Sequence, residues 1–283
     1  MKTTMAVHRR SRTSLGTGVV LVVLVLTGAA PSAQAKAMVG GFKARCAYTR
    51  SLADDPIVHP GDPGASHLHD FFGNKTTTAA TTTESLQAGP TTCQPLGDHS
   101  AYWVPSLYND GTQVAPLRVA AYYNLNGRQP GSIVAFPTGL RMIAGDSNAT
   151  SAQPATITDW SCLPKPPGTT AGGVPTCDPT SHLLLRVTFP DCWDGLALDS
   201  PDHRSHMAVS EGTSDGLRHC PATHPQAVPQ LALKVEYPIR GGPGVTLSSG
   251  GQVSGHADFW NAWVPDQLSH LVDTCLNTPT TCD

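Results

Sequence analysis

The sequence predicts a mainly β fold, an antiparallel β-sandwich or jelly-roll-like single domain that is stapled by disulfides and carries a short C-terminal helix. Three observations support this prediction. Glycine and proline together account for 52 of 283 residues, glutamate occurs only three times, and short apolar or alternating segments recur between turn-forming residues. Because few stretches favour helix, strands are expected to be the main elements.

Residues 1–35 are predicted to form a secretory signal peptide. Basic residues lie in its first third, an apolar run extends from Gly16 to Ala30, and Ala33-Gln34-Ala35 supplies small residues for cleavage. The run is short for a membrane span, and no stop-transfer charges follow it directly. Arg9-Arg10 leaves the twin-arginine route open beside the general export route. We therefore expect a secreted, extracellular protein.

Cleavage after Ala35 would leave residues 36–283, enough for one mature domain with a substantial core. Four of the 18 basic residues lie in the signal, so 14 remain against 21 acidic residues and the net charge is −7. No basic cluster remains along the mature sequence, and no second apolar run reaches membrane-spanning length. We expect no nucleic-acid partner, and no membrane association after the signal is removed.

The eight cysteines all lie in the mature part and predict four disulfides, since the count is even and the compartment is oxidising. Short loops favour Cys162–Cys177 and Cys275–Cys282, which leaves Cys46–Cys93 and Cys192–Cys220 as the natural remainder. A cysteine metal site is less favoured because no Cys-x-x-Cys pair occurs. Each disulfide is expected to contribute about 2–4 kcal/mol.

Strands are expected where short apolar or alternating runs lie between turn signals. These runs are Ala101–Leu107, Leu117–Tyr123, Ser132–Phe136, Leu140–Ala144, Leu183–Phe189, Met207–Ser210 and Leu231–Tyr237. One segment has helical periodicity instead. Pro265 suits the first turn of a helix, and Leu268, Leu271, Val272 and Cys275 would share one face.

The stretch from Asp55 to Asn74 is the strongest candidate for a functional site. His67 and His69 are two residues apart, so in an extended strand both imidazoles leave the same face. His256 and Asp258 repeat that spacing. Imidazoles beside a carboxylate suit a divalent transition metal such as zinc or copper better than calcium. We therefore expect His67, His69 and His256 to be metal ligands, or to form a metal-free acid–base site with an aspartate.

Three later clusters combine aromatic, histidine and aspartate side chains. A single histidine or tryptophan is more often structural than functional, but repeated clusters of this mixed chemistry favour one shared site. We expect His67, His69, His206 and His256 to face one cleft that Asp194 and Asp258 can reach. The candidate catalytic residues are Asp194, Asp258, His206 and Tyr102, and the candidate substrate-binding residues are Trp103, Trp193, His203 and Trp260.

These motifs together resemble a secreted bacterial and fungal family known as domain of unknown function 1996, over about residues 41–275. The motifs are Asp55-Pro-Ile-Val, Ser66-His67-Leu-His69, Tyr102-Trp103-Val-Pro105, Cys192-Trp193-Asp194-Gly195, His203-Arg-Ser-His206, Cys220-Pro221 and His256-Ala-Asp258-Phe259. Some fungal relatives carry carbohydrate-binding modules beside this domain. The resemblance thus implies a cell-wall or polysaccharide setting by analogy, although this chain has no such module.

Two hypotheses follow for the function. The first is a hydrolase or lyase that acts on an extracellular or cell-wall glycan, with aspartates as acid and base and histidines assisting or holding a metal. The second is a non-catalytic carbohydrate- or metal-binding protein. A nucleophilic triad fits less well, because Gly-x-Ser-x-Gly is absent and every cysteine is expected to be paired.

Overall fold

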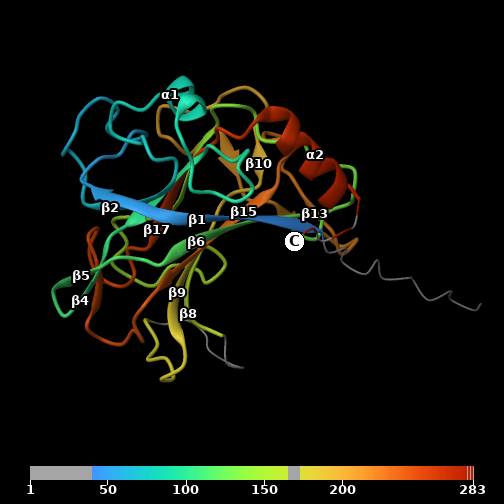
Figure 1. The fold of residues 1–283 in the computed structure, drawn as a ribbon. Coiled ribbons are helices and arrows are strands. Elements are labelled where there is room, and N and C mark those ends of the chain that lie inside the picture. Colours follow the sequence, from blue (N-terminus) through green and yellow to red (C-terminus); the bar gives the residue numbers. More distant parts are fainter. Residues whose placement is uncertain (1–39, 165–172, 279, 281, 283) are drawn as a thin grey trace, which may run out of the picture. The chain divides into compact units, whose positions relative to one another are not determined.

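The computed structural model describes residues 40–164, 173–278, 280 and 282, so the expected signal peptide lies outside the described residues. Its main element is a nine-stranded antiparallel sheet in the order β7-β17-β3-β2-β1-β6-β15-β9-β8 (Figure 1). In chain order these strands are β1 (Gly41–Leu52), β2 (His69–Gly73), β3 (Ala101–Pro105), β6 (Arg118–Asn124), β7 (Arg141–Gly145), β8 (Thr158–Leu163), β9 (His182–Thr188), β15 (Gln230–Tyr237) and β17 (His256–Trp260).

Three small sheets and two helices complete the fold. The small sheets combine β4 (Leu107–Asn109), β5 (Thr112–Val114) and β16 (Val245–Leu247); β10 (Cys192–Trp193), β11 (Met207–Ala208) and β14 (Gln226–Ala227); and β12 (Glu211–Gly212) with β13 (Arg218–His219). The helices are α1 (Thr83–Ala88) and α2 (Pro265–Cys275). No helix among the described residues is long and apolar enough to cross a membrane.

The large sheet curls until it is nearly closed, with β7 at one edge contacting β9 near the other. Alternate side chains of both halves therefore point into one shared core. Aromatic rings join the halves there: Phe259 of β17 lies 6.4 Å from Phe189, and Phe42 of β1 stacks on Tyr123 of β6 at 4.6 Å. This arrangement confirms the predicted mainly β, antiparallel fold.

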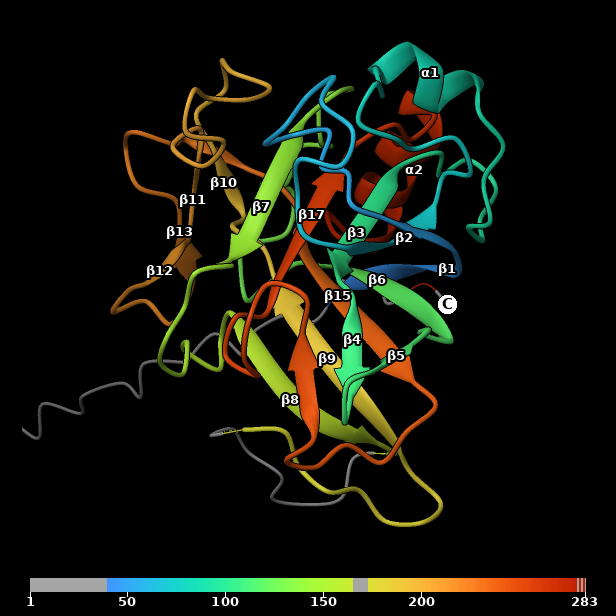
Figure 2. The ribbon, with the colours of Figure 1, turned by 90° about the vertical axis from the view of Figure 1, so that its left-hand side faces the viewer.

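A second, smaller core lies on the outer face of β7, β17, β3 and β2. Residues 53–68, called here the covering loop, cross this face together with α1 (Figure 2). Ile57 from the loop and Leu86 from α1 pack there with Trp103 and Trp260. One half of the sheet is thus buried on both faces, which places the polar residues of its outer face in a low-dielectric setting.

All four predicted disulfides are present: Cys46–Cys93, Cys162–Cys177, Cys192–Cys220 and Cys275–Cys282. The predicted C-terminal helix is α2, which has Pro265 at its start and buries Leu268, Val272 and Cys275. It contacts β1, beside which it lies in Figure 1.

Two strand predictions need correction. Ser132–Phe136 forms no strand, although Ile133 and Phe136 are buried, because its backbone bonds to Ala227 and to the side chain of Asn277 rather than to a strand ladder. The segment Met207–Ser210 contains only the two-residue β11. The longest strand, β1, was not predicted, although Phe42, Ala44 and Cys46 alternate with Lys43 and Arg45.

Candidate metal centre

His67 and His69 converge with His256, which is distant in the sequence, on the outer face of β2 and β17, beneath the covering loop. The Nε2 atom of His256 lies 3.1 Å from Nε2 of His67 and 3.4 Å from Nε2 of His69. His69 opens β2, His256 opens β17, and His67 ends the covering loop. We refer to these three residues as the histidine cluster. One ring nitrogen from each lies within 4.8 Å of the other two.

Hydrogen bonds on the far side of two rings fix which nitrogens face each other. His69 donates its Nδ1–H to the carbonyl of Asp54 at 3.0 Å, and His256 donates its Nδ1–H to the carbonyl of Ser254 at 3.0 Å. In the neutral imidazole the Nε2 atom then carries only a lone pair. Two lone pairs therefore face each other across 3.4 Å, an arrangement that a cation between them would stabilise.

Burial keeps the cluster neutral. It lowers the pKa of His69 to about 3, with a further contribution from the neighbouring His67. Burial also lowers the pKa of His256 to about 3, and His69 adds to that effect. The pKa of His67 is lowered as well, again mainly by burial. Neutral imidazole is the form in which histidine binds a metal.

The separations between these nitrogens match those of a tetrahedral site. With Zn–N bonds of about 2.0–2.1 Å, two ligand nitrogens of a tetrahedron lie about 3.3–3.4 Å apart. The observed separations are 3.1 and 3.4 Å. Carbonyl groups that hold the Nδ1 side of ligating histidines are the usual outer shell of such sites. The donor set and its spacing therefore fit zinc, and three imidazoles also suit copper.

The covering loop is shaped by two aspartates at its start. Asp54 accepts hydrogen bonds from the backbone of Gly64 and Ala79, and Asp55 accepts from Ile57 and Val58. Gly61 and Gly64 have φ of 76° and 81°, a left-handed conformation that glycine adopts without strain. The Pro-Gly steps of the sequence thus turn the loop back over the sheet, which carries His67 to the other two histidines.

Asp258 lies two residues after His256 on the same face of β17 and is 1% exposed. Its Oδ2 atom is buried and has no hydrogen-bond partner among the described residues. Burial, and then the charge of Asp55, raise the pKa of Asp258 well above its ordinary value. Oxygens of Asp55 and Asp258 and a nitrogen of His69 also lie within 4.8 Å of one another. A carboxylate pair therefore adjoins the histidine cluster.

A polar cavity of about 430 Å³ opens beside these groups. Asp55, His67, His256 and Asp258 form part of its wall. The rest of the wall includes polar side chains from three loops, namely His59, Ser66, Ser147, Asn148, Asp202, His203 and Arg204. A small polar molecule, or one unit of a polymer, would reach the histidine cluster through this cavity.

Of the other predicted site residues, His203 lines the cavity and donates its Nδ1–H to the carboxylate of Asp199 at 3.0 Å. His206 and Asp194 do not line it. Both ring nitrogens of His206 are engaged, with Ser200 Oγ at 2.9 Å and the Arg141 carbonyl at 2.7 Å. Asp194 accepts from the backbone of Leu196 and Ala197 in a turn. The structure therefore does not bring Asp194 and His206 to this cavity, and their catalytic roles stay a prediction.

Tyr102 also lies away from the cavity, because its side chain points into the shared core. Its hydroxyl donates to Asp98 at 2.6 Å and lies 2.6 Å from the hydroxyl of Tyr123. Burial raises the pKa of Tyr102 well above 10, so the phenol stays protonated. The structure therefore does not bring Tyr102 to the cavity, and its catalytic role stays a prediction.

The three tryptophans that were expected to bind substrate do not lie at the cavity. Trp103 and Trp260 are 0% and 2% exposed, within the core under the covering loop. Trp193 is half-buried and donates its indole N–H to the carbonyl of Ala197. None of the three lines the cavity. Sugar stacking on these rings is excluded for Trp103 and Trp260, because their surfaces are covered.

Sequence reasoning did not assign several residues that the fold brings to the site. Asp55 and His59 lie in the Asp55–Asn74 stretch, and Arg204 lies in the His203-Arg-Ser-His206 motif. Their positions in these motifs could have identified them as candidate site residues. The carbonyls of Asp54 and Ser254, which orient the ligating rings, leave no signal in the sequence, since any residue supplies a carbonyl.

Comparisons with known proteins agree with the motif pattern. No curated protein and no solved structure matches the chain. A family model described as "Domain of unknown function (DUF1996)" matches residues 55–263, a range that includes the histidine cluster and both carboxylates. The chain belongs to this family.

Proposed function

We propose that this protein is a secreted metal-dependent hydrolase or lyase that acts on extracellular or cell-wall carbohydrate. The observation that carries the proposal is the convergence of three Nε2 atoms at 3.1 and 3.4 Å, with two of the rings held by backbone carbonyls. A structural zinc site has four protein ligands, whereas a catalytic one has three and an open position. Three histidines beside a cavity match the second type.

A divalent ion in such a site polarises an oxygen of the substrate or activates a water molecule. The chain supplies the proton-transfer groups beside it. Asp258 has a buried oxygen with no partner, and Asp55 is held at the cavity wall by two backbone N–H groups. One of these carboxylates would accept a proton at the reacting centre while the other orients the substrate.

The polar wall supports carbohydrate as the substrate class. Ser66, Ser147, Asn148, Asp202 and Arg204 offer hydroxyl, amide, carboxylate and guanidinium groups, which match the hydroxyls of a sugar. Secretion, which is part of the proposal, is supported by four disulfides in the chain.

A second candidate is a metal-binding protein without catalysis. It is favoured by the placement of the tryptophans, because none of the described residues that line the cavity is a tryptophan, tyrosine or phenylalanine that would stack on a sugar. Both candidates need the metal, but only the first predicts turnover.

The test compares the mature protein with the double variant His67→Ala/His69→Ala and with His270→Ala, an exposed histidine on α2. We expect about one zinc or copper ion per chain by elemental analysis in the parent and in His270→Ala, and almost none in the double variant. Release of sugar fragments from a panel of cell-wall glycans should be lost with the metal. If the double variant keeps its fold, its metal and its turnover, the proposal is wrong.

A further inference from the structure

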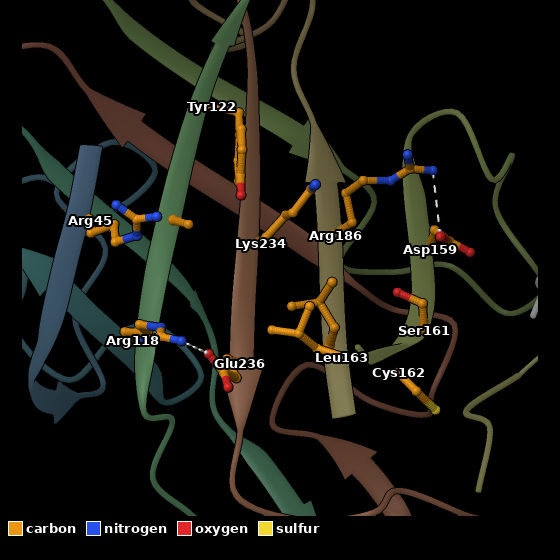
Figure 3. A pocket seen from close by; sticks show the side chains of 12 residues that line it. Arg45, Arg118, Tyr122, Asp159, Ser161, Cys162, Leu163, Arg186, Lys234 and Glu236 are labelled. Carbon is orange, nitrogen blue, oxygen red and sulfur yellow. Dashed lines mark ion pairs between the residues drawn. The ribbon is translucent and has the colours of Figure 1, made fainter. Parts of the chain in front are cut away.

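The other half of the large sheet has a groove on its outer face, away from the histidine cluster. A cavity of about 280 Å³ lies there on β1, β6, β15, β9 and β8 (Figure 3). Arg45, Arg118, Arg186 and Lys234 line it, and we call these four residues the cationic groove. Arg45, Arg186 and Lys234 project outward, because both neighbours of each along the strand are core residues, and Arg118 projects outward because Val119 beside it is in the core.

Strand register places three of these cations in one row. Arg45 pairs with Ala120, Ala120 with Lys234, and Lys234 with Arg186. Adjacent strands lie about 4.8 Å apart, so the row extends about 14 Å across the sheet. Ala120 contributes only a methyl group and leaves an open floor between Arg45 and Lys234. The row runs perpendicular to the strands.

The carboxylates in this groove do not neutralise it. Glu236 is 2.7 Å from Arg118, and Asp159 is 3.5 Å from Arg186. Arg45 is exposed and forms no ion pair with any described residue. The Nε–H of Arg186 is buried without a partner among the described residues. Among the described residues that line the groove, four carry a positive and two a negative formal charge, although residues 36–283 carry a net charge of −7.

Lys234 is held in position by an aromatic ring. Its Nζ lies 4.2 Å from the centre of the Tyr122 ring, within the range of a cation–π contact. Figure 3 shows Tyr122 and Lys234 beside each other on adjacent strands, with Arg186 on the next strand. A partly fixed cation loses less side-chain entropy when it binds an anion.

We propose that the cationic groove binds an acidic polysaccharide that carries a carboxylate on each sugar. Arg45 and Lys234 lie two strand spacings apart, about 9.6 Å, and Lys234 and Arg186 lie one spacing apart, about 4.8 Å. These distances are close to the lengths of two pyranose units and of one, so a sugar chain laid across the sheet brings carboxylates near all three cations. An extended acidic peptide places same-face carboxylates about 6.6–6.8 Å apart, which does not match. Guanidinium groups bind carboxylates through charge-assisted hydrogen bonds.

The test uses isothermal titration calorimetry with oligogalacturonate and the mature protein, in the presence of EDTA. Arg45→Glu is compared with Lys75→Glu, which changes the net charge equally at an exposed position after β2. We expect at least about tenfold weaker binding for Arg45→Glu, because an attractive charge becomes repulsive, and less than about twofold for Lys75→Glu. Both variants should keep the parent's melting temperature, since both positions are exposed.

The proposal would be overturned by no binding of oligogalacturonate by the parent, by equal losses in the two variants, or by stronger Arg45-dependent binding of single-stranded DNA than of the uronate. The EDTA separates this test from the proposed metal chemistry. Loss of binding on adding EDTA would place the uronate at the histidine cluster instead and would also contradict the proposal.

Discussion

The outer faces of the two halves of the large sheet offer opposite chemistry. On β2 and β17 the covering loop buries His69 and His256, which are 0% and 4% exposed, and their neutral Nε2 atoms converge. On β1, β6, β15 and β9 the outward side chains remain partly in water, and the Arg118 side chain is 53% exposed. The depth of burial, rather than strand geometry, causes this difference. Burial disfavours the charged forms of side chains, whereas contact with water stabilises them.

The two regions also differ in how much they depend on the loops. The histidine cluster needs residues 53–68 to bring His67 to the sheet, and the cavity needs residues 202–204 for part of its wall. The cationic groove is built almost wholly from strands whose register is fixed by ladder hydrogen bonds. Changes in the loops should therefore affect the first region and leave the second intact.

The largest expected effect comes from Asp258→Asn. Under the proposed function this change removes a proton-transfer group but leaves the three imidazoles, so turnover should fall by about 10²–10⁴-fold while bound metal is retained. Oligogalacturonate binding in the groove should stay within about twofold of the parent. The measurements are initial rates, elemental analysis and calorimetry on one preparation. Turnover within threefold of the parent would remove Asp258 from the mechanism.

A smaller effect is expected from opening the Cys192–Cys220 disulfide, which spans 28 residues that include His203 and Arg204. By loop-closure entropy, Cys192→Ala/Cys220→Ala should lower the free energy of unfolding by about 3.5 kcal/mol. Turnover should fall further than this stability loss explains, because part of the cavity wall is freed.

The matched control for that variant is Cys275→Ala/Cys282→Ala, whose cysteines are seven residues apart. The same entropy argument gives about 2.4 kcal/mol for the shorter loop. Urea denaturation measures both values. Equal losses of turnover in the two double variants, at a temperature where both remain folded, would show that the Cys192–Cys220 disulfide has no special role at the cavity.

The smallest effect concerns the core that both faces share. Burial raises the pKa of Asp98 to about 6, although hydrogen bonds from Tyr102 and Ser100 oppose the shift. Because the unfolded value is about 3.9, the folded state binds the extra proton between pH 4 and pH 6. The contribution of Asp98 to stability is therefore greatest near pH 4 and falls by about 2–3 kcal/mol as pH rises through 6.

This dependence should disappear in Asp98→Asn, which cannot ionise. The free energy of unfolding of the parent minus that of the variant should decrease by about 2–3 kcal/mol as pH rises from 4 to 7, measured by urea denaturation at fixed ionic strength. A difference that is constant over this range would show that Asp98 titrates with an ordinary pKa.

Much of the fold could be predicted from the sequence, because the alternation of apolar and polar residues, the turn residues and the cysteine spacing are local signals. They predicted the β class, the helix from Pro265 and all four disulfides. Local signals failed at Ser132–Phe136, where buried apolar residues lie in an irregular segment. Burial alone does not distinguish such a segment from a strand.

The candidate site could be predicted only in part from the sequence, because its residues come from segments that are distant in the chain. The spacing of two predicted a common strand face for His67 with His69 and for His256 with Asp258. His256 and Asp258 both lie on β17, whereas His67 lies in the covering loop before β2 and contacts His69 from there. Asp194 and His206 belong to equally prominent motifs, yet turn and loop hydrogen bonds occupy them. The cationic groove was missed entirely, because its residues lie on four different strands and no stretch of the sequence is basic.

The most direct test of the metal centre is an anomalous difference map from a crystal of the purified mature protein, recorded on both sides of the zinc and copper absorption edges. We predict one strong peak about 2.0–2.1 Å from Nε2 of His67, His69 and His256, with Asp258 nearby. The contradicting result is a map from metal-supplemented crystals that shows no peak among these three nitrogens.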